Sequence, residues 1–286
     1  MPGERGAAPV LDCGGRPLVL DRPRVMGILN ITPDSFSDGG RFLSPQAALD
    51  HAMNMVEEGA DLIDVGGEST RPGSDEVGVA EELERVMPVI EALSGEVPVP
   101  LSVDTSKPDV MKAAAAAGAG FINDVFALQR EGALEAARET GLPVCLMHMQ
   151  GTPRTMQQDP RYDDVMVEVK AFLGERVAAC VGAGIPRDRL VLDPGFGFGK
   201  RSVHNFRLLR ELRGVVNMGL PVVVGMSRKS MVGGVLGRPP GERIHGSVAA
   251  AVLAAWEGAL IVRVHDVRPT VDAMAVVHAT LYNDTE

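Results

Sequence analysis

Acidic and amide side chains stand directly after several short apolar runs of the sequence. Asp104, Asn123 and Asp193 each follow such a run. Carboxylates accept hydrogen bonds and asparagine both donates and accepts them, so three such groups gathered in one pocket would be poorly solvated without a ligand. A flat heterocycle with an amide edge and an exocyclic amine offers the matching groups. The pattern predicts binding of such a ring, although each residue could instead cap a helix or join two loops.

Basic and hydroxyl side chains follow two further apolar runs near the end of the chain. Lys229 and Ser230 come after one run, and Arg263 and His265 close the other. Such groups can hold a diphosphate through charge-assisted hydrogen bonds. They therefore predict an anion site.

Two glycines precede a third group of candidate anion ligands. Gly66 and Gly67 permit close backbone approach, and the segment continues through Ser69, Thr70 and Arg71. Such clusters are weak signals alone, but this one follows a predicted strand. We expect it to supply donors to the same anion.

Asn30 ends the first apolar run and begins a loop over residues 31–42 that is too polar to be core. Its neutral oxygen suits Mg²⁺, which takes oxygen ligands and retains several waters. Asn30 could instead cap a turn. Gly39 and Gly40 favour a mobile lid over the site.

The segment 193–200 (DPGFGFGK) superficially resembles a phosphate-binding loop but lacks residues that such a loop requires. Pro194 stands where a Walker loop needs glycine, and Arg201 replaces the hydroxyl residue that holds magnesium. We interpret the segment as a wall in which Phe198 could stack on a ring. Motifs for a serine nucleophile, a paired-histidine zinc site or a cysteine–histidine pair do not occur, which favours displacement of a diphosphate by a substrate that is already nucleophilic.

The elements that carry these residues alternate between strand and helix. Apolar runs cover residues 25–29, 62–65, 100–103, 121–122, 143–147, 190–192, 221–224 and 260–264. Segments with helical spacing cover residues 44–58, 79–93, 108–117, 132–140, 164–183, 202–213, 244–257 and 269–281. Eight such units predict a single α/β (β/α)8 TIM barrel over 24–286, with the site at the carboxyl ends of its strands. Residues 1–23, with a turn at 13–17, predict a short β-hairpin that caps the closed end.

Composition narrows the class of protein. The 286 residues carry 28 Lys and Arg against 38 Asp and Glu, a formal charge of −10, which argues against nucleic acid as a partner. Apolar runs are too short to cross a membrane, and the first residues do not resemble a signal peptide. Cys13, Cys145 and Cys180 lack metal-like spacing, so we expect reduced thiols and a cytoplasmic protein.

Taken together, these motifs resemble those of the dihydropteroate synthase family in its bacterial single-domain form. The matching stretches are 26–40 (MGILNITPDSFSDGG), 66–73 (GGESTRPG), 193–200, 225–231 (GMSRKSM) and 263–266 (RVHD). The resemblance implies an enzyme of folate biosynthesis that joins 6-hydroxymethyl-7,8-dihydropterin diphosphate to 4-aminobenzoate, with Mg²⁺, as a homodimer.

The resemblance also assigns roles to individual residues. It implies that the pterin is held by Asp104, Asn123, Asp193, Lys229 and, as a further substrate-binding residue, Met147. It implies that Asn30 binds magnesium and that the diphosphate end meets Thr70, Arg71, Arg263 and His265. Aminobenzoate would lie among Phe36, Pro72, Gly197, Phe198, Lys229 and Ser230. Since these loops match the ordinary family pattern, we expect sulfonamides to compete with aminobenzoate.

Two other readings share parts of this pattern. A folate-dependent methyltransferase acting with a corrinoid protein would share the pterin residues, but would need neither the Asn30–Asp34 loop nor the anion site around Lys229. A catalytically inactive paralogue would be expected to lack Arg263, Lys229, Asn30 or Thr70, all of which are present.

Overall fold

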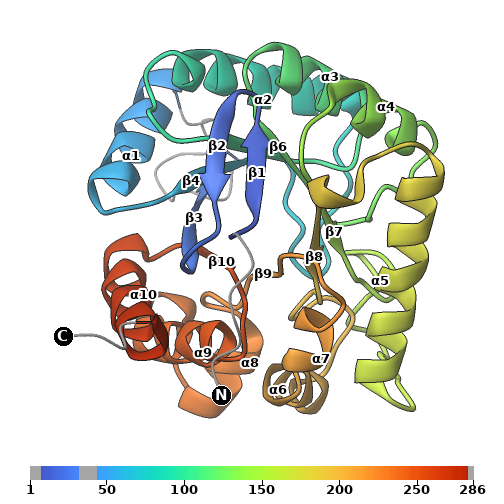
Figure 1. Ribbon diagram of the computed structural model, residues 1–286, viewed down its shortest axis with the longest axis vertical. Coiled ribbons are helices and arrows are strands. Elements are labelled where there is room, and N and C mark those ends of the chain that lie inside the picture. The colour runs from blue at the N-terminus through green and yellow to red at the C-terminus, as the bar shows by residue number, and fades with distance from the viewer. Residues whose placement is uncertain (1–7, 32–43, 283–286) are drawn as a thin grey trace.

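The computed structural model describes residues 8–31 and 44–282. Its centre is a ring of parallel strands (Figure 1). They are β3 (Arg24–Asn30), β4 (Leu62–Gly66), β5 (Leu101–Asp104), β6 (Phe121–Asp124), β7 (Val144–Met147), β8 (Leu190–Asp193), β9 (Val223–Val224) and β10 (Ile261–Val264). Their order is β8-β7-β6-β5-β4-β3-β10-β9, and a parallel bridge between Leu192 and Val222 joins the two edges. The predicted eight-stranded barrel is confirmed.

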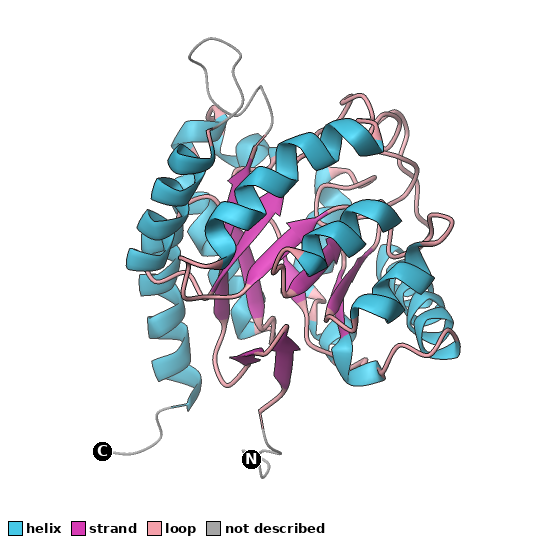
Figure 2. Ribbon diagram, turned by 90° about the horizontal axis from the view of Figure 1, so that it is seen from above, coloured by secondary structure: helices cyan, strands magenta, loops and turns pink. Residues whose placement is uncertain are grey.

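Helices surround the strands and bury their outward side chains (Figure 2). They are α1 (Pro45–Glu57), α2 (Val79–Ser94), α3 (Pro108–Ala116), α4 (Ala133–Thr140), α5 (Val165–Gly182), α6 (Ser202–Arg210), α7 (Arg213–Val216), α8 (Ser230–Leu236), α9 (Ile244–Trp256) and α10 (Val267–Tyr282), with short 3-10 turns at Arg187–Arg189 and Pro240–Glu242. Ser44 caps α1 as expected, because its hydroxyl accepts the Ala47 N–H at 3.2 Å. In the described part of the chain, every helix is too short or too polar to cross a membrane.

Two helical segments differ from the sequence-based expectation. A single helix over 202–213 is wrong, because Glu211 leaves helical geometry (φ −107°, ψ 15°) and a separate short helix, α7, follows. The carboxylate of Glu211 pairs there with Arg207 and Arg210. The additional helix α8 follows β9 and ends at Gly237, which adopts the left-handed conformation (φ 63°) that glycine tolerates.

An N-terminal hairpin closes one end of the barrel. Strands β1 (Val10–Cys13) and β2 (Arg16–Val19) pair antiparallel, and Figure 1 shows them across the centre of the ring. Their buried side chains form one apolar cluster with residues near the amino ends of the barrel strands, among them Phe121 and Cys145. The hairpin therefore fills the end opposite the expected site.

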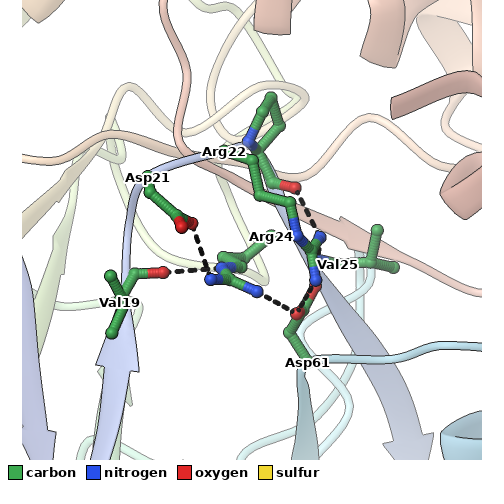
Figure 3. A network of polar contacts seen from close by, with 7 residues as sticks. Val19, Asp21, Arg22, Arg24, Val25 and Asp61 are labelled. Atoms are coloured by element: carbon green, nitrogen blue, oxygen red, sulfur yellow. Dashed lines mark hydrogen bonds and ion pairs between the residues drawn. The ribbon is translucent and has the colours of Figure 1, made fainter. Parts of the chain in front are cut away.

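Polar contacts hold the hairpin to the barrel. Asp61 lies between two arginines (Figure 3) and accepts from Arg22 at 2.6 Å and from Arg24 at 2.8 Å. Its other oxygen accepts the Val25 N–H at 2.8 Å, while Arg24 donates to the Val19 carbonyl of the hairpin at 2.6 Å. One carboxylate thus joins the exit of the hairpin to the first two barrel strands.

The closeness of the hairpin to the barrel gives a stability prediction. A β-carbon added at Gly120 would lie 2.3 Å from the Cys13 carbonyl oxygen, so Gly120→Ala must displace the hairpin backbone. We expect a loss of about 1–3 kcal/mol in the free energy of unfolding. Gly95→Ala is the control, because a β-carbon there meets nothing within 4 Å and φ is −87°. Urea unfolding measures both; equal effects would contradict the tight contact.

Candidate active site

Strand register brings the predicted polar residues to one mouth of the barrel. Across β3 to β6, Asn30 lies opposite Gly66, Gly66 opposite Asp104, and Asp104 opposite Asn123. On the far side, Met147 of β7 lies opposite Asp193 of β8. The expected gathering of these residues at the carboxyl ends of the strands is therefore observed.

Arg263 of β10 reaches across the mouth to two carboxylates. Its Nε donates to Asp64 Oδ2 at 2.6 Å, and its Nη2 donates to Asp104 Oδ2 at 2.9 Å. The arginine side chain is 19% exposed, so part of it still faces the mouth. A guanidinium has five N–H donors in a fixed fork, which leaves donors for an incoming anion.

Asp64 is the centre of this network and was not among the predicted site residues. Its side chain is fully buried and accepts hydrogen bonds from Ser102 at 2.5 Å and Asn123 at 3.1 Å, besides the one from Arg263. The available signal was a carboxylate inside an apolar run, since a buried charge requires partners. Asp64 orients two of the predicted site residues from inside the barrel.

Burial disfavours the ionised form of the two mouth carboxyls. It raises the pKa of Asp104, and the neighbouring Arg263 opposes that rise. It also raises the pKa of Asp193, where Lys229 and the Gly195 N–H act in the opposite direction. Both carboxyls are short of solvation, which favours a ligand that donates hydrogen bonds to them.

Lys229 lies near Asp193, which is expected to bind the pterin, and near Phe198, which is expected to stack on a ring. Its ammonium donates to the Phe196 carbonyl at 2.5 Å and lies 4.4 Å from the centre of the Phe198 ring. Burial lowers its pKa to about 8, and the nearby Asp193 acts against this. A β-carbon at Gly197 would touch the lysine chain at 3.0 Å, so Gly197 leaves room for it.

The backbone of the β9–α8 loop aims Lys229 into the mouth. Arg228 adopts the left-handed conformation (φ 59°), which is uncommon for a residue other than glycine. Its N–H donates to Ser247 at 2.9 Å, and its guanidinium pairs with Asp266 at 2.5 Å. Ser230, the first residue of α8, is exposed. Arg228 was predicted only as part of the motif at 225–231.

His265 is held in a neutral state in the free protein. Its Nδ1 lies 3.0 Å from the Ser227 hydroxyl. Burial lowers the pKa of His265 to about 3, with further lowering by Arg263 and Arg228. His265 can therefore exchange hydrogen bonds with an anion.

A buried lysine fixes the β8–α6 loop, which begins after Asp193 and contains residues 194–201. The Lys200 ammonium donates to the carbonyls of Gly195 at 2.9 Å and Phe198 at 3.0 Å, and it contacts His148 Nδ1 at 2.9 Å. Gly195 has no room for a β-carbon, which would lie 1.8 Å from the His148 carbonyl oxygen. Lys200 is thus internal to the loop, in agreement with the argument that this is not a Walker motif.

The remaining expected residues lie at the rim. Thr70 is half-buried, whereas Arg71 and Pro72 are exposed on the β4–α2 loop. Phe36, expected beside aminobenzoate, lies outside the described residues. Within the described part of the chain, histidine, cysteine and acidic side chains form no cluster of three suited to a metal ion.

Comparison with known proteins agrees with this geometry. The family described as "Pterin binding enzyme" matches residues 26–265. Dihydropteroate synthase of Escherichia coli (strain K12) is 58% identical over 267 residues, covering 93% of this chain and 95% of that protein. The structure of the Yersinia pestis dihydropteroate synthase with a sulfonamide drug complex matches with a TM-score of 0.92 and 57% identity, covering 95% of this chain and 98% of the other.

A further solved structure contains 7,8-dihydropteroate. Dihydropteroate synthase from Xanthomonas albilineans in complex with 7,8-dihydropteroate matches with a TM-score of 0.86 and 50% identity, covering 96% of this chain and 99% of the other. The similarity extends over nearly the whole length of both chains. The chain therefore belongs to the pterin-binding enzymes and, within them, to the dihydropteroate synthase family.

Proposed function

We propose that the protein condenses 6-hydroxymethyl-7,8-dihydropterin diphosphate with 4-aminobenzoate, releasing 7,8-dihydropteroate and diphosphate. The observation that carries the proposal is one barrel mouth in which buried acceptors for a heterocycle, Asp104 and Asp193, adjoin the basic groups of Lys229 and Arg263. The product seen in the Xanthomonas albilineans relative contains both halves that such a mouth would join.

The pterin ring would bind deep in the mouth. Asp193 and Asp104 would accept hydrogen bonds from ring N–H groups, and Asn123 would donate and accept at the amide edge. Met147, opposite Asp193, would contact the ring through its apolar chain. Because Asn123 is held by Asp64 at 3.1 Å, its amide is oriented before the substrate arrives.

The reaction breaks the CH₂–O bond of the pterin substrate. The bonding electron pair leaves with diphosphate, the aniline nitrogen forms the new C–N bond, and one proton leaves that nitrogen. Asp104 and Asp193 stabilise positive charge that develops on the pterin, while Arg263, Thr70 and Arg71 stabilise the departing anion. His265 would contribute a hydrogen bond. The aniline attacks uncharged, so no strong base is required.

Aminobenzoate would occupy the outer part of the mouth. Phe198 and Gly197 would face its ring, Lys229 and Ser230 would lie near its carboxylate end, and Pro72 together with Phe36 would complete the wall. Sulfonamides share the aniline ring, so we expect them to compete for this place. The sulfonamide complex of the Yersinia pestis relative supports this expectation.

Asn30 would provide the protein's ligand to Mg²⁺. Its Oδ1 lies beside Gly66, close to where a β-carbon would be (3.5 Å), and Asp104 borders the same glycine. Mg²⁺ binds through few protein oxygens plus waters and substrate phosphates, so a single amide oxygen suits it. When bound, the ion would neutralise charge on the leaving diphosphate.

A coupled assay of diphosphate release tests the proposed reaction. Diphosphate should appear only when both substrates are present, and 7,8-dihydropteroate should form in equal amount. Release without aminobenzoate, or no release with both substrates, would contradict the proposal.

Lys229→Ala should lower kcat/KM by about a hundredfold, because a preorganised charged donor at the reacting site is lost. Lys112→Ala is the control, since Lys112 lies on α3 and pairs with Glu139 on the surface. A Lys229 variant within twofold of wild type in the diphosphate assay would exclude Lys229 from the site.

Asn30→Ala should raise the Mg²⁺ concentration that supports half-maximal activity by about tenfold or more, as expected when a metal-site partner is removed. Calorimetric titration of Mg²⁺ with diphosphate into each protein gives a second readout. An unchanged Mg²⁺ requirement and unchanged heats would assign the ion to other residues.

The protein would act as a homodimer. Exposed apolar side chains gather on three helices that contact one another, namely Val203 and Phe206 of α6, Val235 and Leu236 of α8, and Leu253 and Trp256 of α9. Figure 1 shows these helices grouped on one side of the barrel.

Three free buried cysteines also suit a reducing compartment such as the cytoplasm.

Light scattering tests the dimer. The wild-type protein should have twice the chain mass of 30.3 kDa, and Val203→Glu combined with Val235→Glu should reduce it to one chain. Val276→Glu on α10, where the valine is 67% exposed, is the matched control and should stay dimeric. A monomeric wild type, or a dimeric double variant, would contradict this assignment.

A further inference from the structure

We propose that Glu68 is a positioning residue. By pairing with the buried Lys107, it holds the β4–α2 loop (residues 67–78) over the barrel mouth. The kinetic part of this proposal rests on the proposed function, because the loop carries Thr70, Arg71 and Pro72. The structural part concerns the loop alone.

Lys107 joins three separate elements at one buried point. Its ammonium pairs with Glu68 Oε2 at 2.5 Å and also with Glu82. Lys107 belongs to the β5–α3 loop, three residues after Asp104, and Glu82 belongs to the first turn of α2. The β4–α2 loop, α2 and the β5–α3 loop therefore meet at one ammonium.

Glu68 also closes the base of the loop. Its second oxygen, Oε1, accepts the Val77 N–H at 3.2 Å, so Glu68 holds the two ends of the loop together. Between them, the Ser74 hydroxyl donates to the carbonyls of Ser69 at 2.5 Å and Arg71 at 2.8 Å. The exposed turn that presents Arg71 and Pro72 is thus compact, and Glu68 fixes its base.

Glu68 and Glu82, the two carboxylates that pair with Lys107, have different roles. The side chain of Glu82 is fully buried and that of Lys107 is 5% exposed, so this pair would satisfy the buried ammonium without Glu68. Glu68 is 17% exposed and is the partner that reaches the loop. Removing Lys107 would leave Glu82 as an uncompensated buried charge, which is strongly destabilising. Removing Glu68 leaves the buried pair intact and loosens the base of the loop, while the Gly73 N–H still donates to the Pro153 carbonyl at 3.1 Å.

A loosened loop predicts a particular kinetic pattern. If the loop occupies its binding position only part of the time, apparent affinity falls by that fraction, while turnover of the bound complex changes little. Glu68→Ala should therefore raise KM for both substrates by about tenfold and leave kcat within about threefold. Glu68→Gln keeps an acceptor for Val77 and should restore part of the loss.

The test combines hydrogen exchange with kinetics. In Glu68→Ala, the Val77 amide should exchange at least about tenfold faster than in wild type, with a thermal midpoint within a few degrees. Glu76→Ala is the matched control, because Glu76 lies in the same loop but is exposed and pairs with Arg130 at 2.7 Å; it should change neither exchange at Val77 nor KM.

Three results decide the matter. Unchanged exchange and unchanged KM in Glu68→Ala would overturn the proposal. A large drop in thermal midpoint with loss of kcat would also overturn it, because Glu68 would then support the fold as a whole. Faster exchange in a protein whose wild type lacks synthase activity would support the positioning role and refute the proposed function.

Discussion

The arrangement of side chains at the open mouth of the barrel depends on the hydrogen bonds that the buried carboxylate of Asp64 accepts. It accepts from Arg263 of β10, Ser102 of β5 and Asn123 of β6, so a single side chain of β4 links four strands. Burying an ion is costly, and removing one partner of a buried pair is more costly still. The arginine is therefore fixed at the mouth, and Asp104, its second acceptor at 2.9 Å, is fixed with it.

One end of the barrel contributes to the stability of the fold, and the other end carries the candidate binding site. At one end the hairpin adds apolar side chains to the cluster around Phe121, and Asp61 ties it to β3 and β4. At the other end, Asp193 and Lys229 remain short of solvation. A barrel interior filled at its closed end can carry this unfavourable polar burial, which a substrate with matching donors and acceptors then relieves.

Much of this arrangement could be predicted from the sequence, for a physical reason. Parallel strands place their carboxyl ends together, so the polar residues after successive apolar runs had to meet. What escaped prediction depends on partners distant in sequence: Asp64 contacts Arg263 across 199 positions, and Glu68 contacts Lys107 across 39. The lowered pKa of His265 arises from burial and neighbouring arginines, and Glu211 pairs with Arg207 and Arg210 where α6 ends. The periodicity of apolar residues along the sequence does not predict these contacts, the pKa shift or the helix end.

Calorimetric titration of a pterin into Asp64→Asn tests the central claim most directly. Asparagine keeps the volume but weakens the charged hydrogen bonds that orient Arg263 and Asn123. Bonds to charged groups contribute about 1.5–3 kcal/mol, so we expect binding to weaken roughly ten- to a hundredfold while circular dichroism shows an intact fold. An affinity within twofold of wild type in a folded variant would contradict the account, because the mouth would then keep its binding geometry without the buried charge.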